Sequence, residues 1–184
     1  VYNNLFNNCG YAGGAYFSEN VHLYATPTDT LRDVYIDNNT FYNPSANGVL
    51  TEVSFSADSA GIVKNINFRN NTSVNAISGY LRVRSFVGTI DSILSNTNIV
   101  YGCGNSNNIV YDLETPTNVS IINSIKSNPL LNGSYLPGTG SPALGAALNI
   151  GLPTTNIGYY GTSSFTPLPV SNTTIWFDKY QFHW

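Results

Sequence analysis

A short pattern built around paired asparagines recurs along the chain and constrains its fold more than any other feature. In four stretches an apolar, strand-like lead runs into an asparagine pair or near-pair: residues 1–6, 34–41, 63–72 and 90–98. Asn4, Asn39, Asn71 and Asn98 follow one another at spacings of 35, 32 and 27 residues. Such a period is too long for a hairpin and indicates a solenoid. Because the leads are β-branched and aromatic, each repeat is expected to be a coil of short, parallel strands.

The asparagines themselves are predicted to form a structural column. Asparagine tolerates the left-handed backbone of a tight bend, and its side chain can bond local backbone groups. Carboxamides stacked at the strand repeat can also donate to one another, as in cross-β ladders. We therefore expect Asn39, Asn71 and either Asn96 or Asn98 to stack about 5 Å apart per coil, in a structural rather than a sugar-binding role.

Two further strand candidates lie between the asparagine sites, at residues 50–55 and 81–86. Alternation along these strands directs four apolar side chains to the core: Val53, Phe55, Leu81 and Val83. The same alternation directs Glu52, Arg82 and Arg84 outward.

Composition narrows the range of partners. Only 9% of residues are charged, against about 25% in typical proteins, and the net charge is −3. A chain with this charge content lacks the excess of basic residues that is typical of proteins that bind nucleic acid or an anionic membrane. Polarity comes instead from neutral groups, including 26 asparagines, beside 13 tyrosines. Such surfaces are usual in secreted or cell-surface proteins that meet sugars, and no apolar run approaches the ~20 residues of a transmembrane helix.

The two cysteines are expected to be buried thiols. Cys9 lies five residues after Asn4 and Cys103 five residues after Asn98, so both belong to one column about three coils apart. At roughly 4.8 Å per strand they are ~14 Å apart, beyond the ~7 Å reach of a disulfide. The first repeat also begins at Val1 without a preceding cap, which suggests a missing N-terminal part or, alternatively, a short and imperfect first coil.

The segment from residue 127 to residue 161 carries a family resemblance. Its order of residues, NPLL, then GSPALGA, then NIGYYG, resembles the closing segment of secreted bacterial β-helix proteins of the pectate-lyase-like superfamily. Gly145 stands where that segment usually has aspartate. The resemblance implies a right-handed parallel β-helix, here of about five or six coils, formed by residues 1–161. Residues 162–184 would then form a C-terminal extension that includes a capping or docking strand.

The resemblance also implies an enzyme as an alternative, because many members of the superfamily cleave acidic polysaccharides by β-elimination. That reaction needs a cation near the substrate carboxylate and a base near the proton that is removed. Arg82, Arg84 and Glu52 are the candidates, although Glu52 with Arg84 also fits a surface cross-strand ion pair. No cofactor is predicted, and no metal site, since the four-residue spacing of Asp29, Asp33 and Asp37 does not converge three carboxylates.

The terminal segment alternates aromatic and polar residues, with Trp176, Tyr180, Phe182 and Trp184 on one face. An exposed strand of this kind is an aggregation hazard, so it is expected to cap this chain or dock on another. We expect a non-catalytic extracellular or cell-surface module that presents loops to a glycan or a surface protein. A polysaccharide lyase and a self-assembling subunit of an extracellular filament are the alternatives.

Overall fold

The computed structural model of the chain describes residues 1–7, 19–43, 51–86, 88–104, 109–112 and 117–161. Their strands form three four-stranded parallel sheets, in which neighbours along each sheet come from successive repeats. Sheet 1 contains β1 (Leu5–Asn7), β4 (Thr40–Tyr42), β7 (Thr72–Val74) and β10 (Ile99–Tyr101). Sheet 2 contains β2 (Glu19–Ala25), β5 (Thr51–Asp58), β8 (Gly79–Phe86) and β11 (Ile109–Asp112). Sheet 3 contains β3 (Thr30–Asp37), β6 (Ile62–Arg69), β9 (Thr89–Asn96) and β12 (Thr117–Ile122).

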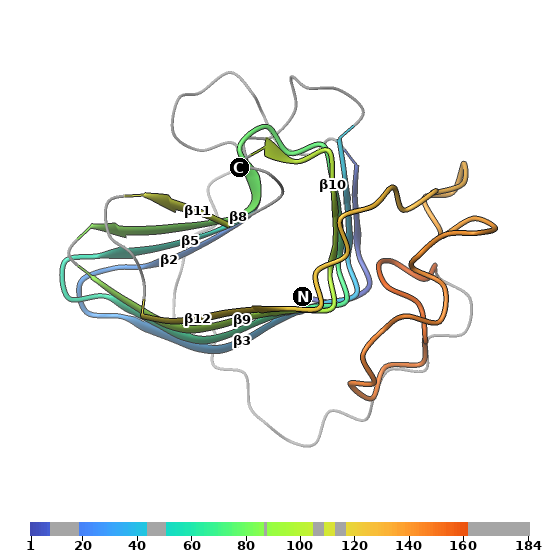
Figure 1. The fold of residues 1–184 in the computed structure, drawn as a ribbon. Coiled ribbons are helices and arrows are strands. Elements are labelled where there is room, and N and C mark those ends of the chain that lie inside the picture. The colour runs from blue at the N-terminus through green and yellow to red at the C-terminus, as the bar shows by residue number, and fades with distance from the viewer. Residues whose placement is uncertain (8–18, 44–50, 87, 105–108, 113–116, 162–184) are drawn as a thin grey trace.

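The chain visits sheets 2, 3 and 1 in turn, and each circuit, called a coil below, pairs with the circuit before it. Figure 1 looks along the stack: sheets 2 and 3 face each other and sheet 1 closes one side. The fold is therefore all-β with parallel sheets, consistent with a parallel β-helix. In the described part of the chain, none of the helical structure is long and apolar enough to cross a membrane.

Side chains from all three sheets fill the space between them. Val53, Phe55, Leu81 and Val83 are fully buried, as the alternation in their strands predicts. A run of aromatic rings crosses the core from coil to coil, with centroids 4.8 Å apart for Phe6 and Phe41 and 6.2 Å apart for Phe41 and Phe68. Phe6 and Phe41 occupy equivalent positions in successive coils, so the ~4.8 Å repeat brings their rings face to face, whereas Phe68 reaches Phe41 from sheet 3.

The second asparagine of each pair points into the corner between sheets 3 and 1. The Asn39 backbone N–H and Nδ2 both donate to Asn71 Oδ1, at 2.9 and 3.0 Å. Asn71 repeats this arrangement on Asn98 Oδ1, at 2.8 and 3.1 Å, and also donates to the Ile36 carbonyl at 2.8 Å. Asn4 donates to Asn39 Oδ1 in the same way. These four residues form a continuous hydrogen-bonded ladder.

The first asparagine of each pair points outward, because its backbone is left-handed. The value of φ is 54° at Asn3, 53° at Asn38 and 54° at Asn70. This single backbone change bends the chain from sheet 3 into sheet 1 and rotates the side chain to the outer surface. Two neighbouring asparagines therefore serve opposite sides of one corner.

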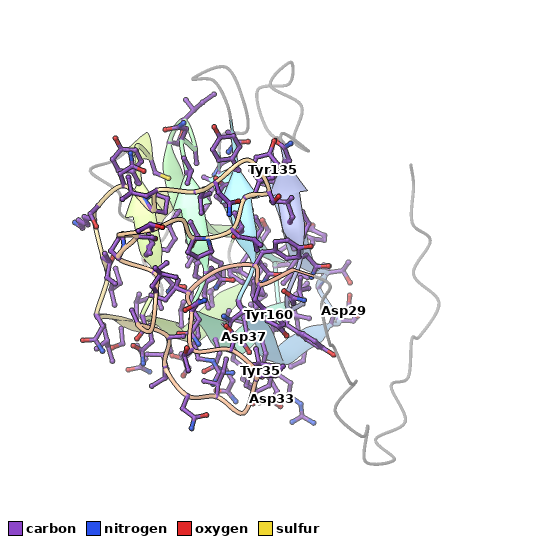
Figure 2. The ribbon with its side chains drawn as sticks, turned by 90° about the vertical axis from the view of Figure 1, so that its right-hand side faces the viewer. Asp29, Asp33, Tyr35, Asp37, Tyr135 and Tyr160 are labelled. Carbon is purple, nitrogen blue, oxygen red and sulfur yellow. The ribbon has the colours of Figure 1, made fainter. Side chains whose placement is uncertain are left out.

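Residues 127–161, called the strap below, lie along the outside of sheet 1 (Figures 1 and 2). Asn70 forms two bonds with one strap residue, accepting from the Leu148 N–H and donating to its carbonyl, both at 2.8 Å. Asn3 does the same with Tyr160 and Gly161, at 3.0 and 3.1 Å. Ile99 from sheet 1 is buried with Ala143 and Ile157 of the strap. The strap is thus fixed by outward asparagines and a small apolar core of its own.

We predict that Gly158→Ala loosens the strap. Gly158 has φ of 89°, and an added Cβ would lie 2.7 Å from Thr72 Oγ1 and 2.8 Å from Thr40 Oγ1. The left-handed backbone and the clash together are expected to cost about 1–3 kcal/mol. Faster limited proteolysis within residues 143–161 would report the effect. Gly140→Ala is the matched control, because its φ is 77° but nothing lies within 4 Å of the added Cβ. Equal proteolysis of both variants would contradict the close packing at Gly158.

Candidate ligand-binding groove

Every strand of sheet 3 contains a left-handed residue, and these residues lie at the same level of the sheet. These residues are Asp33, Asn65, Ser92 and Asn118, with φ between 54° and 56°. Pairing resumes on either side of them, as Arg32 with Lys64 and Val34 with Ile66. Each strand therefore carries a kink at one level, as at a β-bulge, and the four kinks align across the sheet.

The aligned kinks hollow the outer face of sheet 3 into an open groove of about 480 Å³. Polar side chains line it from successive coils, chiefly Asp33, Asn65, Asn67 and Asn118. Asn65 Nδ2 donates to Asp33 Oδ1 at 3.0 Å, which ties two coils together along the groove. The lining contains one carboxylate and no lysine or arginine. The lining therefore offers mainly neutral hydrogen-bond donors and acceptors.

Tyr35 forms an aromatic wall of the groove and remains 49% exposed. The Arg69 guanidinium carbon lies 5.2 Å from the centre of its ring. Arg69 is itself fixed by two bonds to Asp37, Nε to Oδ1 at 2.9 Å and Nη2 to Oδ2 at 2.7 Å. Figure 2 shows Asp33, Tyr35 and Asp37 together near the lower edge of the molecule. The ring is thus held in place with much of its surface open.

The expectation that Glu52 faces outward is wrong. Its side chain is fully buried, and it accepts hydrogen bonds from Asn43 Nδ2 at 2.9 Å and from Asn20 Nδ2 at 2.5 Å. The physical reason is its position at the beginning of β5, beside the corner that Asn43 forms after β4. There, amides from two other segments satisfy the carboxyl oxygens, and strand alternation no longer decides the direction of the side chain.

The expected ion pair between Glu52 and Arg84 is wrong as well, because the register places Arg84 opposite Ser56. Arg82 instead has its Nη1 3.6 Å from Glu19 Oε1, and both side chains are largely buried. The side chain of Arg84 lies outside the part of the chain that the structure describes. Glu52 and Arg82 therefore do not form the exposed acid-and-cation patch that the lyase hypothesis requires.

Burial raises the pKa of Glu52 to about 8, although the hydrogen bonds from Asn20 and Asn43 favour the charged form. Within the described residues, Asn20 Oδ1 and Asn43 Oδ1 are buried without a hydrogen-bond partner. A protonated Glu52 can donate to one of them after rotation of the amide. The cluster is thus suited to a neutral carboxyl at neutral pH.

The remaining predicted residues fall into three groups. Asn39, Asn71 and Asn98 belong to the buried ladder and have at most 1% exposure, so they offer no surface to a sugar. Trp176, Tyr180, Phe182 and Trp184 lie outside the described residues. So does Cys9, and the absence of a disulfide remains a prediction. Cys103 is buried, with Sγ 3.7 Å from the Ser73 carbonyl, and burial raises the pKa of its thiol to about 12.

The groove was not predicted from the sequence, although the sequence contains a signal for it. Asp33, Asn65 and Ser92 each stand six residues before a ladder asparagine, so a small polar residue recurs in step with the ladder. Among the described residues, no group of three or more His, Cys, Asp or Glu side chains is placed to hold a metal. Comparison of the chain with family models, curated proteins and solved structures finds no match in any of the three.

Proposed function

We propose that this chain is a right-handed parallel β-helix module of a secreted or cell-surface protein, and that it binds a neutral glycan without cleaving it. The observation that carries the proposal is the groove on sheet 3. It combines an exposed, fixed tyrosine with amide side chains repeated from coil to coil. Sugars present an apolar face suited to an aromatic ring and hydroxyls suited to carboxamides.

The repeat of the groove favours an extended glycan. Kinked residues from four neighbouring strands line it, and neighbouring strands are about 4.8 Å apart. This spacing is close to the advance of one sugar unit in an extended polymer. Each coil therefore presents at least one polar side chain per sugar, with Tyr35 as a stacking platform beside Asp33 on β3.

The charge of the lining favours a neutral ligand. Asp33 contributes the carboxylate of the lining and pairs with Arg32, whose Nε lies 3.8 Å from Asp33 Oδ2, while no lysine or arginine is itself a lining residue. An acidic polysaccharide would therefore meet a carboxylate and find no basic side chain in the lining with which to pair. The charge of the lining therefore argues against an acidic polysaccharide, which is the substrate class of the lyase hypothesis. The burial of Glu52 argues against that residue as part of a lyase active site.

Binding should depend on Tyr35 and not on an equally exposed tyrosine elsewhere. Against a panel of neutral polysaccharides, the unaltered protein is expected to be retarded in affinity electrophoresis by at least one. Tyr35→Ala should weaken that binding about tenfold or more, since burying an aromatic side chain contributes roughly 1.5–3 kcal/mol. Tyr24 on sheet 2 is 48% exposed, against 49% for Tyr35, so Tyr24→Ala is the matched control.

Two results would overturn the proposal. One is the absence of binding to every neutral polysaccharide tested, and the other is an equal loss in the Tyr35 and Tyr24 variants. Incubation with an acidic polysaccharide distinguishes the lyase hypothesis from binding without cleavage. A lyase would produce unsaturated sugar ends by β-elimination, and these absorb ultraviolet light. We expect no rise in absorbance.

A further inference from the structure

The outward side chains of the corner form a track that binds polypeptide backbone. Five corner residues share a left-handed backbone with φ of 53° or 54°: Asn3, Asn38, Asn70, Thr97 and Asn123. The first three bind main-chain atoms of the strap. The pairing of Asn70 with Leu148 uses both polar atoms of the carboxamide on the N–H and carbonyl of one residue. A carboxamide held in this way recognises backbone and is indifferent to the side chain that the backbone carries.

The last step of the track has no such partner among the strap bonds of the described residues. Asn123 is exposed, and its Nδ2 lies 3.4 Å from Asn96 Oδ1, the one side-chain bond it makes to the residues that the structure describes. Beside it lies an open cavity of about 410 Å³, bounded by Ser124 and Ile125 on one side and by Ala146, Ala147 and Leu148 on the other. The lining carries no charged side chain. The cavity therefore continues the interface that the strap occupies in earlier coils.

We propose that this cavity binds an extended, uncharged peptide segment of a partner protein. Asn123 pairs with the backbone of one residue, as Asn70 pairs with Leu148. A small apolar side chain of the partner fills the space between Ile125 and Leu148. The continuity with the strap interface supports a peptide as the occupant, because the same corner geometry already binds backbone at three positions in this chain. This site lies on the strap side of the corner and is separate from the groove on sheet 3.

The test uses a peptide whose backbone pairing is already seen in the molecule. The probe is acetylated and amidated Ala-Ala-Leu-Asn-Ile, the sequence of residues 146–150, titrated into the ¹⁵N-labelled full chain. Saturable shifts are expected for the Asn123 side-chain amide and for the backbone N–H groups of Ser124 and Ile125, with a dissociation constant in the millimolar range. Asn123→Gly keeps the left-handed backbone accessible and should raise that constant about tenfold or more.

Asn75→Gly is the matched control. Asn75 also has a left-handed backbone, with φ of 63°, its carboxamide donates to the Asn43 carbonyl at 2.9 Å, and it does not line the cavity. Its replacement should leave the peptide titration unchanged. Absence of saturable shifts at Asn123 would overturn the proposal, as would equal affinities of the unaltered protein and the Asn123→Gly variant.

Discussion

Replacing Asn71 with alanine is expected to lower the free energy of unfolding by about 3–5 kcal/mol. The side chain is fully buried and takes part in four hydrogen bonds, two accepted from Asn39 and one donated to each of Ile36 and Asn98. The substitution removes all four and deprives the buried Asn39 N–H of its acceptor. Since domains are stable by only about 5–15 kcal/mol, the loss is a large fraction of the total.

Urea unfolding at 25 °C, followed by circular dichroism, measures this loss. Asn4→Ala is the control within the same ladder, because Asn4 is exposed and stands at the first step. Its removal is expected to cost less than about 1 kcal/mol. Similar losses for Asn4 and Asn71 would show that burial in the ladder does not determine the contribution of each asparagine.

Glu52→Gln is expected to stabilise the protein at pH 8 and to flatten the dependence of its stability on pH. The pKa of the folded carboxyl is about 8, against an ordinary value of 4.5 for a glutamate in water. Between these values the folded state holds a proton that the unfolded chain releases. Stability therefore falls as pH rises through this window, by up to about 1.4 kcal/mol per pH unit from this group.

Comparison of the two proteins in urea at pH 5, pH 6.5 and pH 8 isolates the contribution of Glu52 from that of other groups. Glutamine keeps the size of the side chain and can bond Asn20 and Asn43 after amide rotation, so it carries the neutral state to high pH. The Cys103 thiol does not interfere, because its raised pKa of about 12 places its effect at higher pH. Parallel stability curves would contradict a protonated Glu52 in the folded state.

The sequence predicts the parts of this fold that depend on local periodicity. Val53 and Leu81 are buried because alternation within one strand directs them inward, and the asparagine spacing predicts the stacking of Asn39 on Asn71. Glu52 does not follow this alternation, because its side chain is buried by hydrogen bonds from Asn20 and Asn43, which belong to other segments of the chain. No pattern within β5 carries that information.

The sequence also does not show which asparagine of each pair points outward and which points into the corner. Asn70 and Asn71 are identical side chains, and only the φ value of 54° at Asn70 separates an outward from an inward direction. Likewise, the kinks in sheet 3 break the two-residue alternation, so that Val63, Ile66 and Phe68 are all buried. Conformation at one residue per strand decides where the groove lies, and residue type alone does not specify it.

The central claim is that the two asparagines of a pair perform different tasks, and hydrogen exchange of Asn70→Gly and Asn71→Ala tests it most directly. Removal of the outward Asn70 carboxamide should accelerate exchange in the strap, around residues 148–161, while β6 and β7 remain protected. Removal of the inward Asn71 carboxamide should accelerate exchange throughout the stacked strands. One shared exchange pattern for both variants would contradict the claim.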